Sequence, residues 1–228
     1  MKLLEIAHRG YSEFYKDNTI EAFEKAIIHN FDMIELDIQL TKDEKIIIYH
    51  DTFIKNTNNS YFIIDLTYEE IKSIDNKIPL LIDFFDFLIK NNYKNYPLYL
   101  DIKGTKRIVP HLINLIDTIK VNYDISKIYI ASFNILIIEL LYQQNNNLNY
   151  GIISETMFTS DISKILIDKY KLKFFCFHWS VLQHDEIDLL HQNNVLVFSY
   201  TNKFDIILQK MKQYKLDGIV TNYKILKS

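Results

Sequence analysis

The sequence predicts an α/β fold, an irregular (β/α)8 barrel of the TIM type. Short apolar runs rich in β-branched residues alternate with longer segments of helical periodicity, a pattern typical of parallel strands joined by helices. About eight such units fit into 228 residues, a length at which α/β barrels form one domain. The alternation is interrupted once, near residues 33–50, where one strand follows another directly.

The predicted strands outnumber by one those that the barrel needs. They are residues 3–8, 33–40, 45–50, 98–102, 128–132, 150–154, 174–178, 195–200 and 218–221. Residues 41–44, between the second and third strands, are far fewer than the dozen or so that a parallel crossover requires. We therefore expect an antiparallel hairpin at 33–50, with either Leu40 or Lys42 opposite Lys45.

Helical segments are predicted between the strands. They lie near residues 19–29, 67–74, 80–91, 107–120, 134–145, 161–170, 184–193 and 203–214. Two pairs have the spacing of a capping box, Asn18 with Glu21 and Thr67 with Glu70. No shift of composition, Pro-rich linker or internal repeat divides the chain, so we expect a single domain over 1–228 with a small insertion at about 51–78.

Composition and charge narrow the possible partners. Hydrophobic residues make up 48% of the chain, as in a packed globular protein. The 26 basic and 29 acidic residues give a net charge of -3, so we expect no binding to nucleic acid or anionic lipid. No apolar run reaches the roughly 18 residues of a membrane span, and the first residues lack the apolar stretch of a signal peptide. The single Cys176 fits a reducing compartment, so we expect a cytoplasmic protein, with its oligomeric state left open.

Two acidic residues interrupt the apolar strand at 33–40. Alternation along a strand puts Glu35 and Asp37 on the same face. In either register of the hairpin, His50 returns beside this acidic pair. A carboxylate pair alone could also be a solvated edge, so its meaning depends on what lies nearby.

Other polar residues stand at the ends of further strands. Asp101 and Lys103 repeat the two-residue spacing, and His8 and Arg9 end the first strand. Barrel enzymes assemble their sites at the C-terminal ends of strands, so we expect these side chains to meet those of 33–50. Three carboxylates in a partly dry barrel mouth repel one another unless a cation neutralises them. Oxygen ligands favour Mg²⁺ or Ca²⁺, and two histidines nearby can supply acid–base catalysis.

With these motifs the sequence resembles the glycerophosphodiester phosphodiesterase family, a branch of the phospholipase-C-like phosphodiesterase barrels. The resemblance runs nearly end to end, and although each motif is weak alone, their order and spacing are highly specific. They are "AHRG" at 7–10, "DNTIEAF" at 17–23, "IELDIQLTKD" at 34–43, "HD" at 50–51, "IPLL" at 78–81, "LDIKG" at 100–104, "SF" at 132–133, "YTN" at 200–202 and "DGIVTN" at 217–222.

The resemblance implies an activity and a set of roles. Such enzymes hydrolyse glycerophosphodiesters, for example glycerophosphocholine or glycerophosphoethanolamine, to sn-glycerol 3-phosphate and an alcohol. The implied roles are His8 and His50 as the acid–base pair, Glu35, Asp37 and Asp101 as ligands of one divalent cation, Mg²⁺ or Ca²⁺, and Arg9 and Lys103 as phosphate contacts.

The sequence departs from the family pattern at several positions. "KDNT" stands where "PENT" is usual, and Asp101 replaces a usual glutamate. Tyr200 replaces a common tryptophan, and Asn222 a common aspartate. Two alternatives therefore remain beside the hydrolase. One is a catalytically silent relative that binds a phosphodiester or a protein; the other is a lysophospholipase D, which needs an apolar groove, around Met157 and Phe158 or Trp179.

Overall fold

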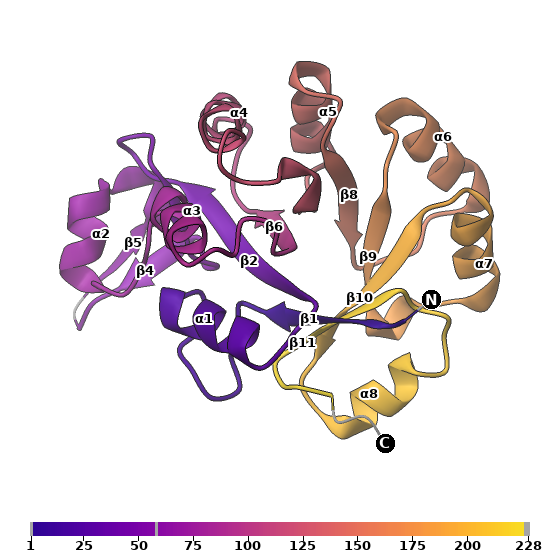
Figure 1. Cartoon of the computed structure of the whole chain (residues 1–228). Coiled ribbons are helices and arrows are strands. Elements are labelled where there is room, and N and C mark those ends of the chain that lie inside the picture. The colour runs from indigo at the N-terminus through magenta and orange to yellow at the C-terminus, as the bar shows by residue number, and fades with distance from the viewer. Residues whose placement is uncertain (1, 58, 226–228) are drawn as a thin grey trace.

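The computed structural model describes residues 2–57 and 59–225. Within this part of the chain, eight parallel strands close into a barrel, since β1 pairs with both β11 and β2 (Figure 1). The predicted barrel is thereby confirmed. In their order around the barrel the strands are β1 (Leu4–His8), β2 (Met33–Leu40), β6 (Leu98–Ile102), β7 (Ile128–Ser132), β8 (Asn149–Ser154), β9 (Phe174–His178), β10 (Leu196–Asn202) and β11 (Gly218–Thr221).

Helices surround the barrel, and each predicted helix is present (Figure 1). The last one is shorter than the 203–214 expected. In the described residues, no helix is both long enough and apolar enough to cross a membrane. The helices are α1 (Ile20–Ile28), α2 (Tyr68–Ile74), α3 (Leu81–Lys90), α4 (Ile108–Ile119), α5 (Ile135–Gln144), α6 (Ser160–Tyr170), α7 (His184–Gln192) and α8 (Asp205–Met211).

Aromatic and aliphatic side chains fill the barrel interior. The ring of Phe174 lies 5.2 Å from that of Tyr99 and 5.1 Å from that of Phe198. A Cβ atom at Gly151 would come within 2.5 Å of the Phe174 ring, so the ring occupies space that only glycine leaves free. The barrel interior is thus a packed apolar core.

The hairpin forms, but in neither of the two predicted registers. β3 (Ile46–Ile48) pairs antiparallel with β2, with Leu40 opposite Ile46. Thr41 therefore faces Lys45 across a turn of residues 42–44, in which Glu44 has a φ of 61°. A three-residue turn with one left-handed residue is common in hairpins, and its length lies between the two-residue and four-residue turns of the expected registers. The strand ends at Ile48, so His50 follows the hairpin instead of pairing within it.

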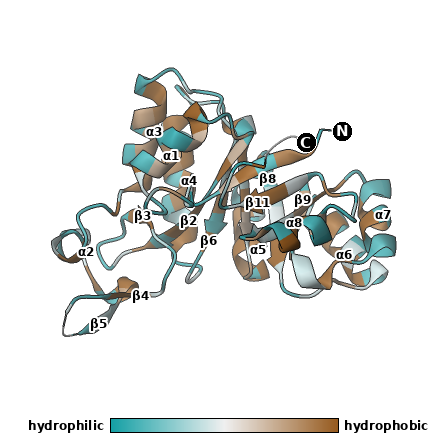
Figure 2. Ribbon diagram, turned by 90° about the horizontal axis from the view of Figure 1, so that it is seen from below, coloured by the Kyte–Doolittle hydropathy of each residue, from teal (hydrophilic) through white to brown (hydrophobic). Residues whose placement is uncertain are grey.

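Residues 51–78 form a small unit beside the barrel. It consists of the hairpin β4 (Phe53–Lys55) and β5 (Ser60–Phe62), a 3-10 turn (Ile63–Asp65) and α2 (Tyr68–Ile74). Figure 2 shows these elements projecting away from the barrel. The capping box of Thr67 and Glu70 is confirmed. The unit shares a small core with β3, made of Ile47, Ile54, Ile63, Tyr68, Ile71 and Ile78.

The other predicted capping box, of Asn18 with Glu21, is wrong. Thr19, and not Asn18, caps α1, because its hydroxyl oxygen accepts a hydrogen bond from the amide of Ala22. Asn18 instead takes a left-handed conformation with a φ of 55°. Asparagine tolerates this conformation better than most residues, and here it turns the side chain toward the barrel mouth.

Candidate active site

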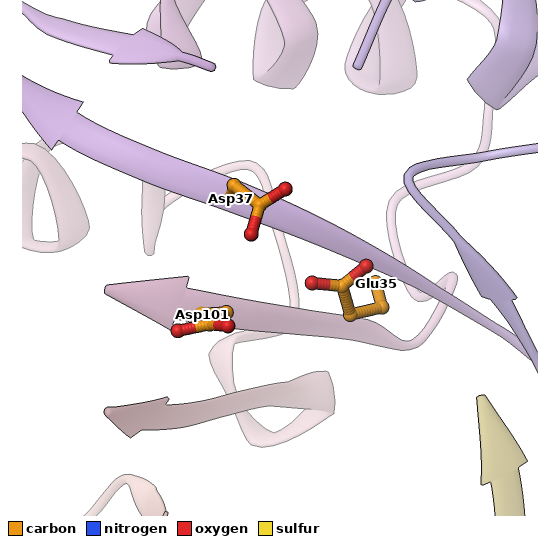
Figure 3. A group of neighbouring side chains, drawn as sticks. All are labelled: Glu35, Asp37 and Asp101. Atoms are coloured by element: carbon orange, nitrogen blue, oxygen red, sulfur yellow. The ribbon is translucent and has the colours of Figure 1, made fainter. Parts of the chain in front are cut away.

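Three carboxylates meet at the barrel mouth. Glu35 and Asp37 project from β2, and Asp101 projects from β6, where it pairs directly with Asp37 (Figure 3). One oxygen of each carboxylate lies within 4.8 Å of one oxygen of the others. All three residues are buried, with exposed fractions of 4%, 1% and 6%. The predicted acidic cluster is therefore assembled by two neighbouring parallel strands.

Burial sets the charge state of the cluster. It raises the pKa of Glu35 well above its usual value, and repulsion from Asp37 and Asp101 adds to this effect. Burial also raises the pKa of Asp101 to about 7. Burial opposes ionisation of Asp37 too, but Lys103 and Arg9 bring its pKa below the usual value. The protein's own cations thus neutralise only part of the cluster.

The cluster has the features of a cation site. Asp101 Oδ1 is buried and has no hydrogen-bond partner among the described residues. Buried carboxylate oxygens without partners are rare, and a divalent ion would provide the missing partner. The residues present thus fit a hard divalent cation held by Glu35, Asp37 and Asp101.

Arg9 and Lys103 form ion pairs with carboxylates of the cluster. Lys103 Nζ lies 2.6 Å from Asp101 Oδ2 and 3.2 Å from Asp37 Oδ1. Arg9 Nε lies 3.0 Å from Asp37 Oδ2, and its backbone amide donates to Glu35 Oε2 at 2.9 Å. Both cations are therefore within reach of an anion bound at the cluster.

Asn18 was missed as a residue of the site. Its Nδ2 group donates to Asp37 Oδ2 at 2.8 Å, and its Oδ1 accepts from the Asp37 amide at 3.3 Å. These two bonds fix the rotamer of a buried carboxylate. The signal was the "DNT" motif at 17–19, which the capping interpretation had explained in another way.

The two predicted histidines have different surroundings. His8 Nδ1 lies 2.7 Å from Asn222 Oδ1, and His50 Nδ1 lies 2.7 Å from Asp51 Oδ1. In each case Nδ1–H can donate to the oxygen, which leaves Nε2 for other partners. Burial, assisted by Arg9, lowers the pKa of His8 to about 4, so His8 is neutral at pH 7.

A single cavity of about 200 Å³ joins all seven predicted residues. Of the other lining residues, Phe133 and Tyr200 lie within motifs of the family resemblance, whereas Glu155 and Lys203, which follow β8 and β10, were not singled out from the sequence. His178 and Trp179 do not line it; the His178 ring packs on Tyr200 at 5.5 Å. The lining residues are His8, Arg9, Glu35, Asp37, His50, Tyr99, Asp101, Lys103, Phe133, Ile153, Glu155, Cys176, Tyr200, Thr201, Lys203 and Val220.

Comparison with known proteins identifies the family of the chain. The model of the glycerophosphoryl diester phosphodiesterase family matches residues 8–225. A glycerophosphodiester phosphodiesterase of Caldanaerobacter subterraneus subsp. tengcongensis is 30% identical over 236 residues, which cover 97% of this chain and 95% of the relative.

Solved structures show the same fold. A phosphodiesterase of Oleispira antarctica, in complex with the product sn-glycerol-3-phosphate, matches with a TM-score of 0.83 at 18% identity, over 96% of this chain and 93% of that one. A glycerophosphodiester phosphodiesterase of Thermotoga maritima matches with a TM-score of 0.77 at 23% identity, over 97% and 95%. From the whole-length match and the relative, the chain belongs to the glycerophosphoryl diester phosphodiesterase family and is a phosphoric diester hydrolase.

Proposed function

We propose that this protein hydrolyses glycerophosphodiesters, such as glycerophosphocholine and glycerophosphoethanolamine, to sn-glycerol 3-phosphate and an alcohol, with the help of one divalent cation. The observation that carries the proposal is the cavity in which three buried carboxylates lie with His8 and His50. The Oleispira relative, which binds sn-glycerol-3-phosphate as its product, supports the same substrate class.

The cation, Mg²⁺ or Ca²⁺, would be held by Glu35, Asp37 and Asp101. When bound, it supplies positive charge that stabilises the developing charge on a phosphodiester under attack. Arg9 and Lys103 extend this positive surface and orient the phosphate oxygens, because their cationic groups border the same cavity.

The histidines divide the proton transfers. His8 is the base: its Nδ1–H is held by Asn222 and its neutral Nε2 can accept a proton from the attacking hydroxyl. His50 is the acid: Asp51 accepts a hydrogen bond from its Nδ1, and its Nε2 gives a proton to the leaving alkoxide. The attacking hydroxyl belongs to water or to the glycerol carbon next to the phosphate ester.

A product assay tests the proposal. The purified protein is incubated with each diester and Mg²⁺ or Ca²⁺, and then with EDTA, while sn-glycerol 3-phosphate is measured. We expect turnover that EDTA stops. The absence of this product with every diester and metal would contradict the proposal.

Substitutions test the residue roles. We expect His50→Ala and Asp37→Asn to lower kcat by at least a hundredfold while the Tm stays within a few degrees of wild type. The matched control is His184→Ala, because His184 is exposed at the start of α7 and does not line the cavity. Near-normal turnover in either site variant would refute the assignment.

The lysophospholipase D alternative finds less support around 157–158. Phe158 packs on the rings of Phe175 and Phe177, with centroids 5.9 Å and 6.3 Å away. Met157 Sδ accepts a hydrogen bond from the Gln183 amide. Because both side chains already contact other residues, they do not form a groove for an acyl chain. We therefore propose soluble glycerophosphodiesters as the substrates in preference to lyso-lipids. The ratio of turnover on glycerophosphocholine to that on its lyso-lipid analogue measures this preference.

A further inference from the structure

The hydroxyl group of Tyr200 is buried in the wall of the catalytic cavity. It has no hydrogen-bond partner among the residues that the structure describes. The ring is fixed from two sides, since it lies edge-on to Phe133 at 6.1 Å and to His178 at 5.5 Å between centroids. Buried hydroxyl groups without partners are unfavourable and rare. Because Tyr200 lines the cavity, a ligand bound there can supply the partner that the hydroxyl lacks.

Tyr200 lies across the barrel from the acidic cluster. In the closed sheet, β10 is separated from β6 by β11, β1 and β2 on one side and by β9, β8 and β7 on the other (Figure 1). The cavity between these walls measures about 200 Å³. A diester bound at the carboxylates can thus extend one of its arms through the cavity toward Tyr200.

A second cavity adjoins the first at Arg9 and His50. It measures about 220 Å³ and shares Arg9 and His50 with the first, and Tyr49 and Asp51 also line it. Because His50 protonates the leaving alcohol in the proposed mechanism, that alcohol lies toward the second cavity. The glycerol arm then lies in the barrel cavity, on the side of Tyr200.

The side chains around Tyr200 can bind a hydroxyl group of a ligand, because they offer both a hydrogen-bond donor and an acceptor. Burial, together with Cys176 and Glu155, raises the pKa of the Tyr200 phenol, so the group is a donor at neutral pH. The Glu155 carboxylate lines the same cavity and can accept. A hydroxyl group can accept from Tyr200 and donate to Glu155 at the same time, which neither a methyl group nor an ammonium group can do.

We propose that the Tyr200 hydroxyl donates a hydrogen bond to the terminal hydroxyl of the glycerol arm, which makes Tyr200 a specificity-determining residue. This inference rests on the proposed function and deepens it, because it places the two halves of the diester in separate cavities. The hydroxyl selects for an arm that carries oxygen at its end.

Steady-state kinetics with two substrates test the inference. The substrates are glycerophosphocholine and its propane-1,2-diol analogue, which lacks only the terminal hydroxyl. We expect wild type to prefer glycerophosphocholine in kcat/KM by roughly threefold to tenfold, as for one neutral hydrogen bond. Tyr200→Phe loses this preference through a lower kcat/KM on glycerophosphocholine, while its kcat/KM on the analogue stays within about twofold of wild type. Its Tm is unchanged or higher, because the hydroxyl has no protein partner to lose.

Tyr129→Phe is the matched control. Tyr129 packs on Phe174 and Phe198 in the barrel interior and does not line the cavity. This control keeps the wild-type preference. A Tyr200→Phe variant that retains the wild-type preference, or that lowers both rates equally, would overturn the inference while leaving the proposed function intact. A wild-type protein that hydrolyses neither diester would overturn both.

Discussion

Asp37 is ionised in the buried cluster because three side chains contact its carboxylate. Asn18 donates to it at 2.8 Å, Arg9 lies at 3.0 Å and Lys103 at 3.2 Å. Glu35 and Asp101 are stabilised less as anions by their neighbours, and burial raises the pKa of each. The cluster therefore carries one secure negative charge and two that depend on a further cation.

At the residue scale, Asn222→Asp tests the role of His8. The new carboxylate would lie where the amide oxygen now lies, 2.7 Å from Nδ1. A negative charge there favours the imidazolium and raises the pKa of His8 from about 4, by about one to three units. Because His8 must be neutral to accept a proton, the acidic limb of the kcat/KM profile moves to higher pH by a similar amount. An unmoved limb would argue against His8 as the base.

The control for this substitution is Asn193→Asp. Asn193 lies at the C-terminal end of α7, where its Nδ2 group donates to the Leu189 carbonyl. Because Asn193 does not line the catalytic cavity, a carboxylate there leaves the acidic limb of the kcat/KM profile at its wild-type pH. Comparing the two profiles separates a local effect on His8 from a general effect of added negative charge.

Residue positions differ in how well the sequence predicts them. Glu35 and Asp37 follow from strand alternation alone, which is a local property. Asn18 does not, since its partner Asp37 lies nineteen residues further on and the contact exists only in the folded barrel. Its local signal, a small polar residue before a helix, fitted a cap equally well.

At the element scale, the hairpin shows a similar limit. The short connection predicted an antiparallel pair of strands. The register of that pair depends on the length of the turn, and the sequence is compatible with a turn of two, three or four residues. Glu44 adopts a left-handed conformation, and the Thr41 hydroxyl accepts from the Lys45 amide, which selects three. The strands β4 and β5 were not predicted, because short exposed strands carry little hydrophobic pattern.

The insertion at 51–78 adjoins His50, the proposed acid, along the chain. Ile71 of α2 is fully buried in its small core, and Ile47 of β3 belongs to the same core. We expect Ile71→Ala to cost about 2–5 kcal/mol of stability. Because His50 and Asp51 lie between β3 and β4, the loosened core also lowers kcat, as measured at a temperature well below the Tm.

A second truncation supplies the comparison. Ile116 of α4 is equally buried but belongs to the main core between helices and barrel. Ile116→Ala should lower the Tm by a similar amount and reduce kcat less. Equal effects of the two substitutions on kcat would contradict a role of the insertion in positioning His50.

At the scale of the whole molecule, the proposed cation site predicts that stability depends on pH and on the ion. In the cation-free protein the pKa of Asp101 is raised to about 7 and that of Glu35 lies well above its usual value. A carboxyl group whose pKa is higher in the folded chain binds more protons when folded, so stability falls as pH rises through this window. The EDTA-treated protein is therefore less stable at pH 8 than at pH 5.

A bound cation would offset this loss of stability at high pH, because it neutralises the ionised carboxylates. Saturating Mg²⁺ or Ca²⁺ should raise the Tm more at pH 8 than at pH 5, because the ionised cluster binds the ion and gains most from it. Thermal unfolding at both pH values, with the ion and with EDTA, measures the difference. A gain in Tm that is the same at pH 5 and pH 8 would show that the ion binds elsewhere.

One titration tests the central claim most directly. Protein stripped with EDTA and then freed of the chelator is titrated with Mg²⁺ or Ca²⁺, while bound ion and turnover of glycerophosphocholine are measured on the same samples. We predict that both saturate together at one ion per chain, and that Asp37→Asn abolishes both. Full turnover in the stripped protein, or undiminished ion binding in Asp37→Asn, would contradict the cation site that Glu35, Asp37 and Asp101 are proposed to form.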